Sequence, residues 1–187
     1  MKKFELTNEF ITNMFGTKLF RIRALVEFGD VEAGELGGYV EKESNLGHDD
    51  NAWVYDNAWV YGDAQVSGDA LVYDNALVYD NAWVYGNAQV SGDARVCGDA
   101  RVCGNGDYAY AHGFGSVNRT TTFFRLKDGG VGVRCGCFYG TLAQFRDKIR
   151  ETHGETKKAQ EYLMLADLME LRFEEDENEV GNRKYVE

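Results

Sequence analysis

The sequence predicts a mainly β protein, in which a short parallel β-helix lies between an N-terminal β cap and a C-terminal module of one β-hairpin and two helices. The first observation behind this fold is a run of nine unbroken six-residue units from Asn51 to Gly104, NAWVYD, NAWVYG, DAQVSG, DALVYD, NALVYD, NAWVYG, NAQVSG, DARVCG and DARVCG. A short, fixed period indicates a solenoid, because each unit buries its apolar face only against its neighbours. The second observation is the order within a unit: Ala and Val lie two apart and share one strand face, while Gly, Asn or Asp fill the corners.

Three units are expected to form one turn of the coil, so that residues 18 apart stack about 4.8 Å from each other, as in any parallel strand pair. Val54 is then predicted to lie in one column with Val72 and Val90. The same spacing predicts three outward ladders: Trp53, Leu71, Gln89; Trp59, Leu77, Arg95; and Gln65, Trp83, Arg101.

The coil is predicted to begin before the obvious units, near Gly38. Val40 and Leu46 are six apart and match the aliphatic place of the repeat, and Ser44 matches the small place. The next small residue, Ala52, follows Leu46 by six positions and not by four. The segment 47–50 is therefore expected to hold a two-residue insertion that bulges from a corner and carries His48.

The flanks of the repeat show other patterns. Alternating residues predict N-terminal strands over 2–6 and 18–28, and a C-terminal hairpin of strands 120–126 and 131–138. A capping box at Thr141 opens a helix that ends at His153, and an apolar stripe predicts a second helix over 157–173. The predicted divisions are an N-terminal β cap, 1–37; the β-helix, 38–108; the ββαα module, 109–173; and an acidic tail, 174–187.

Composition excludes several classes of function. The 187-residue chain has a formal net charge of −11 and no concentrated basic face, which argues against direct nucleic-acid binding through phosphates. No long apolar run or targeting pattern is visible, so we expect a cytoplasmic protein with no membrane contact. Cys135 and Cys137 have one residue between them where zinc sites usually have two, so no metal site is predicted.

The pattern Val54-x-x-x-Ala58-x-Val60 resembles the hexapeptide repeat of left-handed parallel β-helix proteins. The resemblance implies a left-handed coil, a hand that periodicity alone does not show. The best-known enzymes with this repeat are acyl- and acetyltransferases, generally trimers that bind acyl-coenzyme A and use a His as general base. On that alternative reading His112 at the end of the coil, or His48 on its bulge, is the catalytic base and coenzyme A is the cofactor. The main interpretation, a binding protein, predicts no catalytic residue and no cofactor.

The flanking segments carry a second resemblance. The N-terminal FGDVEAGELGGYVEKESNL and the C-terminal TTTFFRLKDG and CGCFYGT are similar to hexapeptide-repeat proteins encoded by phages and prophages. Such proteins are usually labelled by their repeat, as acyltransferases or polymer-forming proteins. The resemblance therefore implies a fold and little assigned chemistry.

Outward aromatic rings and acidic corners are the features that predict partner binding. A narrow rod with large rings on all sides exposes more apolar surface than a monomer ordinarily does, although stacking within the chain is an alternative explanation. The corner carboxylates suggest a mimic of nucleic acid, and turn chemistry alone also explains them. The predicted contact residues are Trp53, Trp59, Trp83, Tyr55, Tyr61, Tyr73, Tyr79, Tyr85, Asp56, Asp74 and Asp80.

These observations lead to one functional expectation and two alternatives. We expect a non-catalytic phage or prophage accessory protein, a dimer or trimer, that engages a protein partner and inhibits a host enzyme or an antiviral defence component. The first alternative is a coenzyme A-dependent acyltransferase. The second is a structural or polymer-forming rod, which a folded module after the coil would block from growing end to end.

Overall fold

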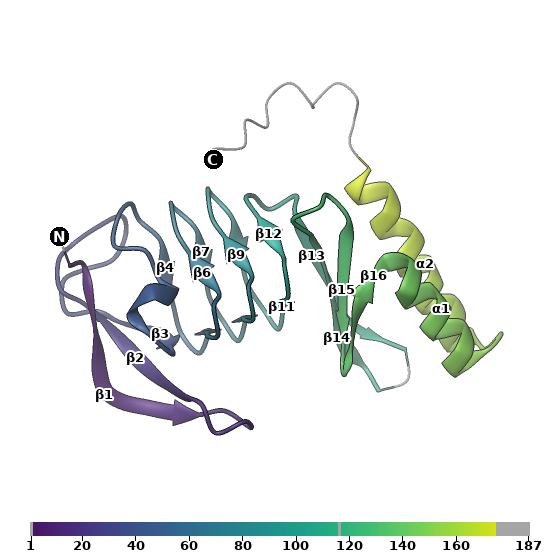
Figure 1. Cartoon of the computed structure of the whole chain (residues 1–187), viewed down its shortest axis with the longest axis horizontal. Helices are drawn as coiled ribbons and strands as arrows, with labels where there is room; N and C mark the ends of the chain where they lie inside the picture. The colour runs from purple at the N-terminus through teal and green to yellow at the C-terminus, as the bar shows by residue number, and fades with distance from the viewer. Residues whose placement is uncertain (1, 116, 175–187) are drawn as a thin grey trace.

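The computed structural model describes residues 2–115 and 117–174, so the predicted acidic tail beyond Glu174 lies outside the described residues. The protein is mainly β. Along its long axis the N-terminal strands come first, followed by the coil, a second sheet and two helices (Figure 1).

The coil consists of two-residue strands joined by tight corners, and successive strands fall on three different faces. Residues 18 apart pair in parallel, including Val54 with Val72 and Val72 with Val90. The predicted column and all three outward ladders are thus confirmed. The strands are β4 (Trp53–Val54), β5 (Trp59–Val60), β6 (Gln65–Val66), β7 (Leu71–Val72), β8 (Leu77–Val78), β9 (Trp83–Val84), β10 (Gln89–Val90), β11 (Arg95–Val96) and β12 (Arg101–Val102).

The repeat folds this way because its two apolar places point inward. Every Ala and Val of the nine units is at most 1 % exposed, and these side chains form one continuous core. Neighbouring turns are joined by backbone hydrogen bonds, such as that from the Tyr55 N–H to the Val72 carbonyl at 2.8 Å. Each turn therefore satisfies the backbone groups of the next.

The N-terminal strands extend one face of the coil into a six-stranded sheet, in the order β1-β2-β3-β5-β8-β11. Val40 pairs with Val60, and Leu46 with Val66, at a separation of 20 where later turns have 18, which confirms the two-residue insertion. The elements are β1 (Phe4–Thr12), β2 (Lys18–Ala24), β3 (Leu36–Val40) and the short 3₁₀ helix η1 (Glu43–Asn45).

The inward small place assigned to Ser44 is wrong. Ser44 is exposed, and the neighbouring Asn45 is fully buried. The Asn45 side-chain amide donates to the carbonyls of Gly62 and Ala64 at 3.1 and 2.8 Å. The 3₁₀ turn rotates Asn45 inward, and its two hydrogen bonds offset the cost of burying an amide.

A four-stranded antiparallel sheet, β13-β14-β15-β16, closes the far end of the coil where the sequence predicted only a hairpin. After the hexapeptide pattern ends, the chain forms a further strand, β13, and Phe138 begins a separate strand after a turn at Gly136. Pairing with β14 supplies the partners that a lone strand pattern does not reveal. The strands are β13 (Tyr108–Phe114), β14 (Arg119–Arg125), β15 (Val131–Cys135) and β16 (Phe138–Thr141).

This second sheet separates two cores. Phe124 of β14 belongs to the core of the coil, whereas its neighbour Phe123 points to the other face and packs with the helices. Alternate strand residues face opposite sides, so one strand serves both cores.

The helices are α1 (Leu142–His153) and α2 (Lys157–Phe173), as predicted. The Thr141 hydroxyl accepts from the Gln144 N–H and the Gln144 side chain accepts from the Thr141 N–H, which confirms the predicted capping box. The Thr156 hydroxyl caps α2 by accepting from the Ala159 N–H. Both helices lie on the side of the second sheet that faces away from the coil (Figure 1).

Candidate functional site

Trp53, the first of the predicted contact residues, is fully buried. Its ring lies 6.2 Å from that of Phe4 and 5.3 Å from that of Phe28, both edge to face. Strand β3 also crosses beside it, and a Cβ on Gly37 would lie 2.8 Å from the indole. The N-terminal cap therefore covers this outward position, so Trp53 is unavailable to a partner and its assignment as a contact is wrong.

Several other outward rings stack on one another within the chain. Tyr61 and Tyr79 lie parallel with their centroids 5.1 Å apart, and Arg134 covers Tyr79 at 6.0 Å. Trp83 stacks on Tyr85 at 4.4 Å and donates from its indole N–H to the Ser67 hydroxyl at 2.8 Å. Tyr79 is buried, and the remaining predicted rings are partly exposed: Trp59, Trp83, Tyr55, Tyr61, Tyr73 and Tyr85.

Asp56, Asp74 and Asp80 are exposed at the corners, with positive φ of 52°, 59° and 61°. Each carboxylate accepts a hydrogen bond from the backbone N–H located 18 residues later, as Asp74 does from Gly92 at 2.9 Å. Asp tolerates this left-handed conformation better than most residues with a Cβ. Turn chemistry therefore accounts for these carboxylates without a partner.

His48 is held in the N-terminal cap. Its ring stacks on Phe4 at 4.5 Å, Nδ1 accepts from the Lys3 N–H at 3.3 Å and Nε2 lies 2.8 Å from a Glu43 oxygen. Because Nδ1 accepts, the Nε2–H donates to Glu43 in the neutral ring. Both ring nitrogens are engaged in holding the insertion, which leaves His48 no geometry for a base.

The Lys3 side chain secures the same insertion. Its ammonium donates to the Asp50 and Ala52 carbonyls at 3.2 and 2.8 Å. Burial lowers the pKa of Lys3 to about 8, although Asp50 and Asp49 act in the opposite direction. These hydrogen bonds thus fix the insertion to the N-terminal cap.

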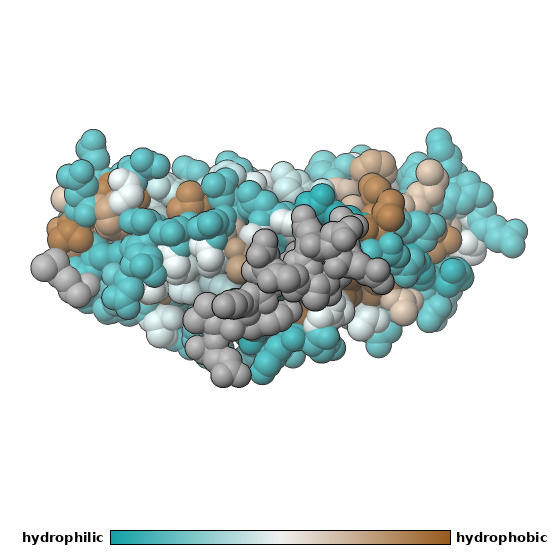
Figure 2. All heavy atoms as spheres, turned by 90° about the horizontal axis from the view of Figure 1, so that it is seen from above, coloured by the Kyte–Doolittle hydropathy of each residue, from teal (hydrophilic) through white to brown (hydrophobic). Residues whose placement is uncertain are grey.

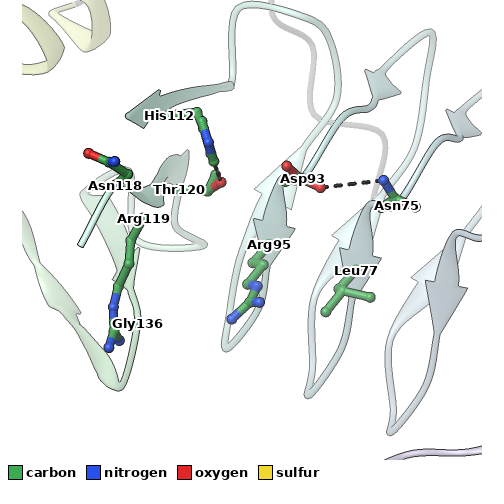
Figure 3. Close-up of a pocket in the computed structure, with 9 residues that line it drawn as sticks. All are labelled: Asn75, Leu77, Asp93, Arg95, His112, Asn118, Arg119, Thr120 and Gly136. Carbon is green, nitrogen blue, oxygen red and sulfur yellow. Dashed lines mark hydrogen bonds between the residues drawn. The ribbon is translucent and has the colours of Figure 1, made fainter. Parts of the chain in front are cut away.

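His112 lines a pocket of about 440 Å³ between the coil and the second sheet (Figure 3). Its Nδ1 is 2.9 Å from the Thr120 hydroxyl, on the strand paired with its own. The residues around the pocket are Asn75, Leu77, Asp93, Arg95, His112, Asn118, Arg119, Thr120 and Gly136. The sequence pointed to His112 but not to the others, because they come from three strands, β8, β11 and β14, and from four separate turns, which meet only in the fold.

The largest exposed apolar feature of the helices is one face of α2. Met164, Leu168 and Leu171 are 71 %, 54 % and 67 % exposed, and their spacing of four and three places them on one side of the helix. The opposite side carries the buried residues Ala159, Tyr162, Ala166, Met169 and Phe173. Helix α2 is therefore apolar on two opposite faces, and the described part of the chain covers one of them.

The β1–β2 turn carries a smaller exposed apolar patch, formed by Met14 and Phe15. On the face seen in Figure 2, apolar residues gather toward the two ends, and the residues visible between them are mostly hydrophilic. The α2 face spans two helical turns with three side chains, and it is the stronger candidate for a protein contact.

The cysteines do not form a cluster suited to a metal. Cys97 is buried against Tyr79, and burial raises the pKa of its thiol to about 11. Within residues 2–115 and 117–174, no three His, Cys, Asp or Glu side chains gather as a metal site requires.

Among the helices that the structure describes, none has the length and apolar character needed to cross a membrane.

Comparison with known families supports the repeat reading. The YdcK β-solenoid repeat matches residues 52–68, 64–78, 72–86 and 88–104, all within the coil. The chain is thus similar to β-solenoid repeat proteins over its central block. A search of curated proteins finds no match.

Proposed function

We propose that this chain is a non-catalytic binding protein that engages a protein partner through the exposed face of α2, formed by Met164, Leu168 and Leu171. The observation that carries the proposal is a helix with apolar residues on two opposite sides, only one of which is covered by the residues that the structure describes. A helix that is apolar all round is normally buried on all sides. Three neighbouring apolar side chains more than half exposed mark an interaction surface.

The partner that this face fits best is a second copy of the chain. When two α2 helices lie antiparallel about a two-fold axis near Leu168, Leu168 of each copy meets its equivalent. Met164 then faces Leu171 of the other copy, because the two residues lie three or four positions on either side of Leu168. A two-fold contact requires such self-complementarity, since the same patch is used twice.

The charges beside this face agree with the antiparallel arrangement. Glu161 and Arg172 are eleven residues apart, close to three helical turns, so they flank the same side of the apolar face. The two-fold axis brings Arg172 of one copy to within about one turn of Glu161 of the other. Both side chains are already held by backbone hydrogen bonds, Glu161 to the Gly115 N–H and Arg172 to the Asn105 carbonyl.

Such a dimer would carry two coils pointing away from a central helical contact, so a target would meet two copies of every coil surface. Two linked binding surfaces raise overall affinity without any new contact.

The phage or prophage origin, and a host enzyme or defence component as the target, stay predictions from the resemblance. A rod growing end to end is disfavoured, because Trp53 lies beneath the N-terminal cap and Ala100 pairs with Leu126 of the C-terminal module.

Sedimentation of the full chain over a range of concentrations tests the proposal. We expect a monomer–dimer equilibrium with a dissociation constant on the order of micromolar, because the contact is small. Leu168→Glu should abolish dimers, since it places two carboxylates at the two-fold axis. Ala143→Glu, which adds the same charge at an exposed position of α1, is the matched control and should dimerise as the parent does.

Two outcomes would contradict this proposal in different ways. A parent chain that stays monomeric at about 1 mM removes the second copy as the partner. If a foreign protein is then retained by the parent and by Ala143→Glu but lost by Leu168→Glu, the binding role stands with a different occupant. If Leu168→Glu changes neither property, the α2 face has no binding role.

One observation favours the coenzyme A-dependent acyltransferase as a second candidate: His112 lines a pocket together with Arg95 and Arg119. A general base needs a near-neutral pKa and access to a substrate hydroxyl or amine, and the exposed position of His112 allows such access. Acetyl transfer from acetyl-coenzyme A to amine acceptors, with loss in His112→Ala, would establish this reading. No thermal shift with saturating coenzyme A would remove it.

A further inference from the structure

The pocket beside His112 gathers unpaired positive charge in a protein whose net charge is −11. Many other cations have acidic partners: Lys2 with Glu43, Arg23 with Glu5, Lys42 with Asp63, Arg125 with Asp107, Arg146 with Asp167 and Glu170, Lys148 with Glu151, and Arg150 with Asp147. Arg95 and Arg119 form no ion pair with any residue that the structure describes. Both line the same pocket, so their charge is available to a ligand.

The Arg119 side chain runs beside the turn at Gly136, which has no Cβ to displace the guanidinium (Figure 3). Gly136 has a φ of +59°, and Asn118, directly before Arg119, has a φ of +51°. Two left-handed residues thus shape the wall in which Arg119 lies.

Arg95 lies on the other side of the pocket, where its backbone is fixed. It occupies the last place of the outward ladder Trp59, Leu77, Arg95, and its backbone N–H donates to the Thr122 hydroxyl at 3.0 Å. This bond joins the coil to β14, the strand that also carries Arg119. The two arginines therefore come from two rigid elements that are fastened to each other.

The remaining groups suit hydroxyls better than a second anion. Asn75 donates to the Asp93 carboxylate at 3.4 Å, and the Thr120 hydroxyl contacts His112 at 2.9 Å. A carboxylate accepts hydrogen bonds from hydroxyls and repels anions. A volume of about 440 Å³ falls within the range of small-molecule sites.

We propose that this pocket binds the phosphate ester of a small hydroxylated molecule, of the size of a sugar phosphate or a nucleoside monophosphate. Arg95 and Arg119 hold the phosphate, because guanidinium groups bind phosphate oxygens with charge-assisted hydrogen bonds. Asp93 and Asn75 bind the hydroxyls of the ester, and Leu77 contacts its carbon skeleton. This role requires neither turnover nor dimer formation.

Titration calorimetry of the full chain tests the assignment, with ribose 5-phosphate and adenosine monophosphate as the two ester probes. Ribose and adenosine are the phosphate-free controls, and inorganic phosphate is the ester-free control. We expect at least one ester to bind more tightly than about 1 mM and more tightly than every control. The ester that binds better identifies whether a sugar phosphate or a nucleotide is preferred.

Charge-removing variants then locate the site. Arg119→Gln and Arg95→Gln should each weaken binding about 10-fold or more, since a hydrogen bond between charged groups is lost. Arg101→Gln is the matched control, because Arg101 ends a ladder on another face and contacts Trp83 outside the pocket. It should leave ester binding unchanged.

Three results would overturn the proposal: no binding of either ester at about 10 mM, equal binding of ribose or adenosine without phosphate, or equal weakening by Arg101→Gln. Circular dichroism of each variant shows whether the fold is retained. The sedimentation of Leu168→Glu is independent of all these results, so failure here leaves the α2 proposal standing.

Discussion

The coil and the C-terminal helix α2 differ in whether their outward apolar residues are covered. On the coil, Trp53 lies under the cap, Tyr61 stacks on Tyr79 and Trp83 stacks on Tyr85. On α2, Met164 and Leu168 are more than half exposed, although the buried face of the same helix is fully packed. A conspicuous aromatic pattern in the sequence therefore does not show where apolar surface is exposed in the fold.

The reason for this difference is the repeat itself. When similar units stack 18 residues apart, each outward side chain has a neighbour in the turn above or below, and rings stack or take a cap. Among the residues that the structure describes, α2 has no such neighbour on its outer side. Surface available to a partner is thus expected where the repetition ends.

The most severe test of the comparison is a charge inside the coil. Val72→Asp should destabilise the protein by more than about 3 kcal/mol and abolish cooperative unfolding of the coil, because it buries a carboxylate without a partner. Gln65→Asp, at an exposed place of β6, should cost less than about 0.5 kcal/mol. Urea unfolding followed by circular dichroism measures both. Similar losses in the two variants would show that the valine column does not hold the coil together.

A second test concerns the covered ring pair and Cys97 beneath it. Burial holds the pKa of the Cys97 thiol at about 11, above its ordinary value of 9.0. Stability from this group is therefore present below pH 9 and lost as the pH rises from 9 to 11, by about 3 kcal/mol. Urea unfolding of the parent and of Cys97→Ala across this range should show a steeper alkaline loss for the parent.

Thiol labelling gives the control for this result. Iodoacetamide at pH 8.5 should modify the exposed Cys103 and Cys137 at least about 100-fold faster than Cys97, which is buried and holds its proton. Rapid labelling of Cys97 in the folded protein would show that the Tyr79 side of the coil is open to solvent, contrary to the stacked arrangement.

The smallest effect is expected at the corners. Asp74→Ala should destabilise the coil by about 1 to 2 kcal/mol, since it removes the hydrogen bond to the Gly92 N–H and leaves a Cβ at a φ of 59°. Asp74→Gly retains the easy backbone conformation and should cost only a few tenths of a kcal/mol. If both variants keep full stability but lose a binding partner, the corner carboxylates act in recognition after all.

The coil was the most predictable part, because its signal repeats. The column of Val54, Val72 and Val90, the outward ladders and the two-residue insertion all follow from spacing. Helix α1 was predicted from the capping box at Thr141, and helix α2 was predicted from its buried apolar stripe. The spacing of Met164, Leu168 and Leu171 also places these residues on one side of a helix. The prediction nevertheless covered only the buried stripe, because an amphipathic helix is expected to have one apolar face.

Other features had no local signal. Asn45 takes an inward place because a 3₁₀ turn rotates it there, and β13 forms because β14 lies beside it. The cover over Trp53 comes from Phe4 and Phe28, more than 20 residues away along the chain. Contacts of this kind depend on how separate elements meet, which spacing along the chain does not encode.

By itself, the sequence determined the period of the coil, its apolar column, its corners and its helix starts, since each of these depends on residues at short or regularly repeated separations. The tertiary structure alone decided which rings are covered, which arginines meet at the pocket and which face of α2 the described residues leave exposed. Burial and charge at a given position are set by neighbours from distant segments, and those neighbours are assigned only when the cap, the coil and the second sheet pack together.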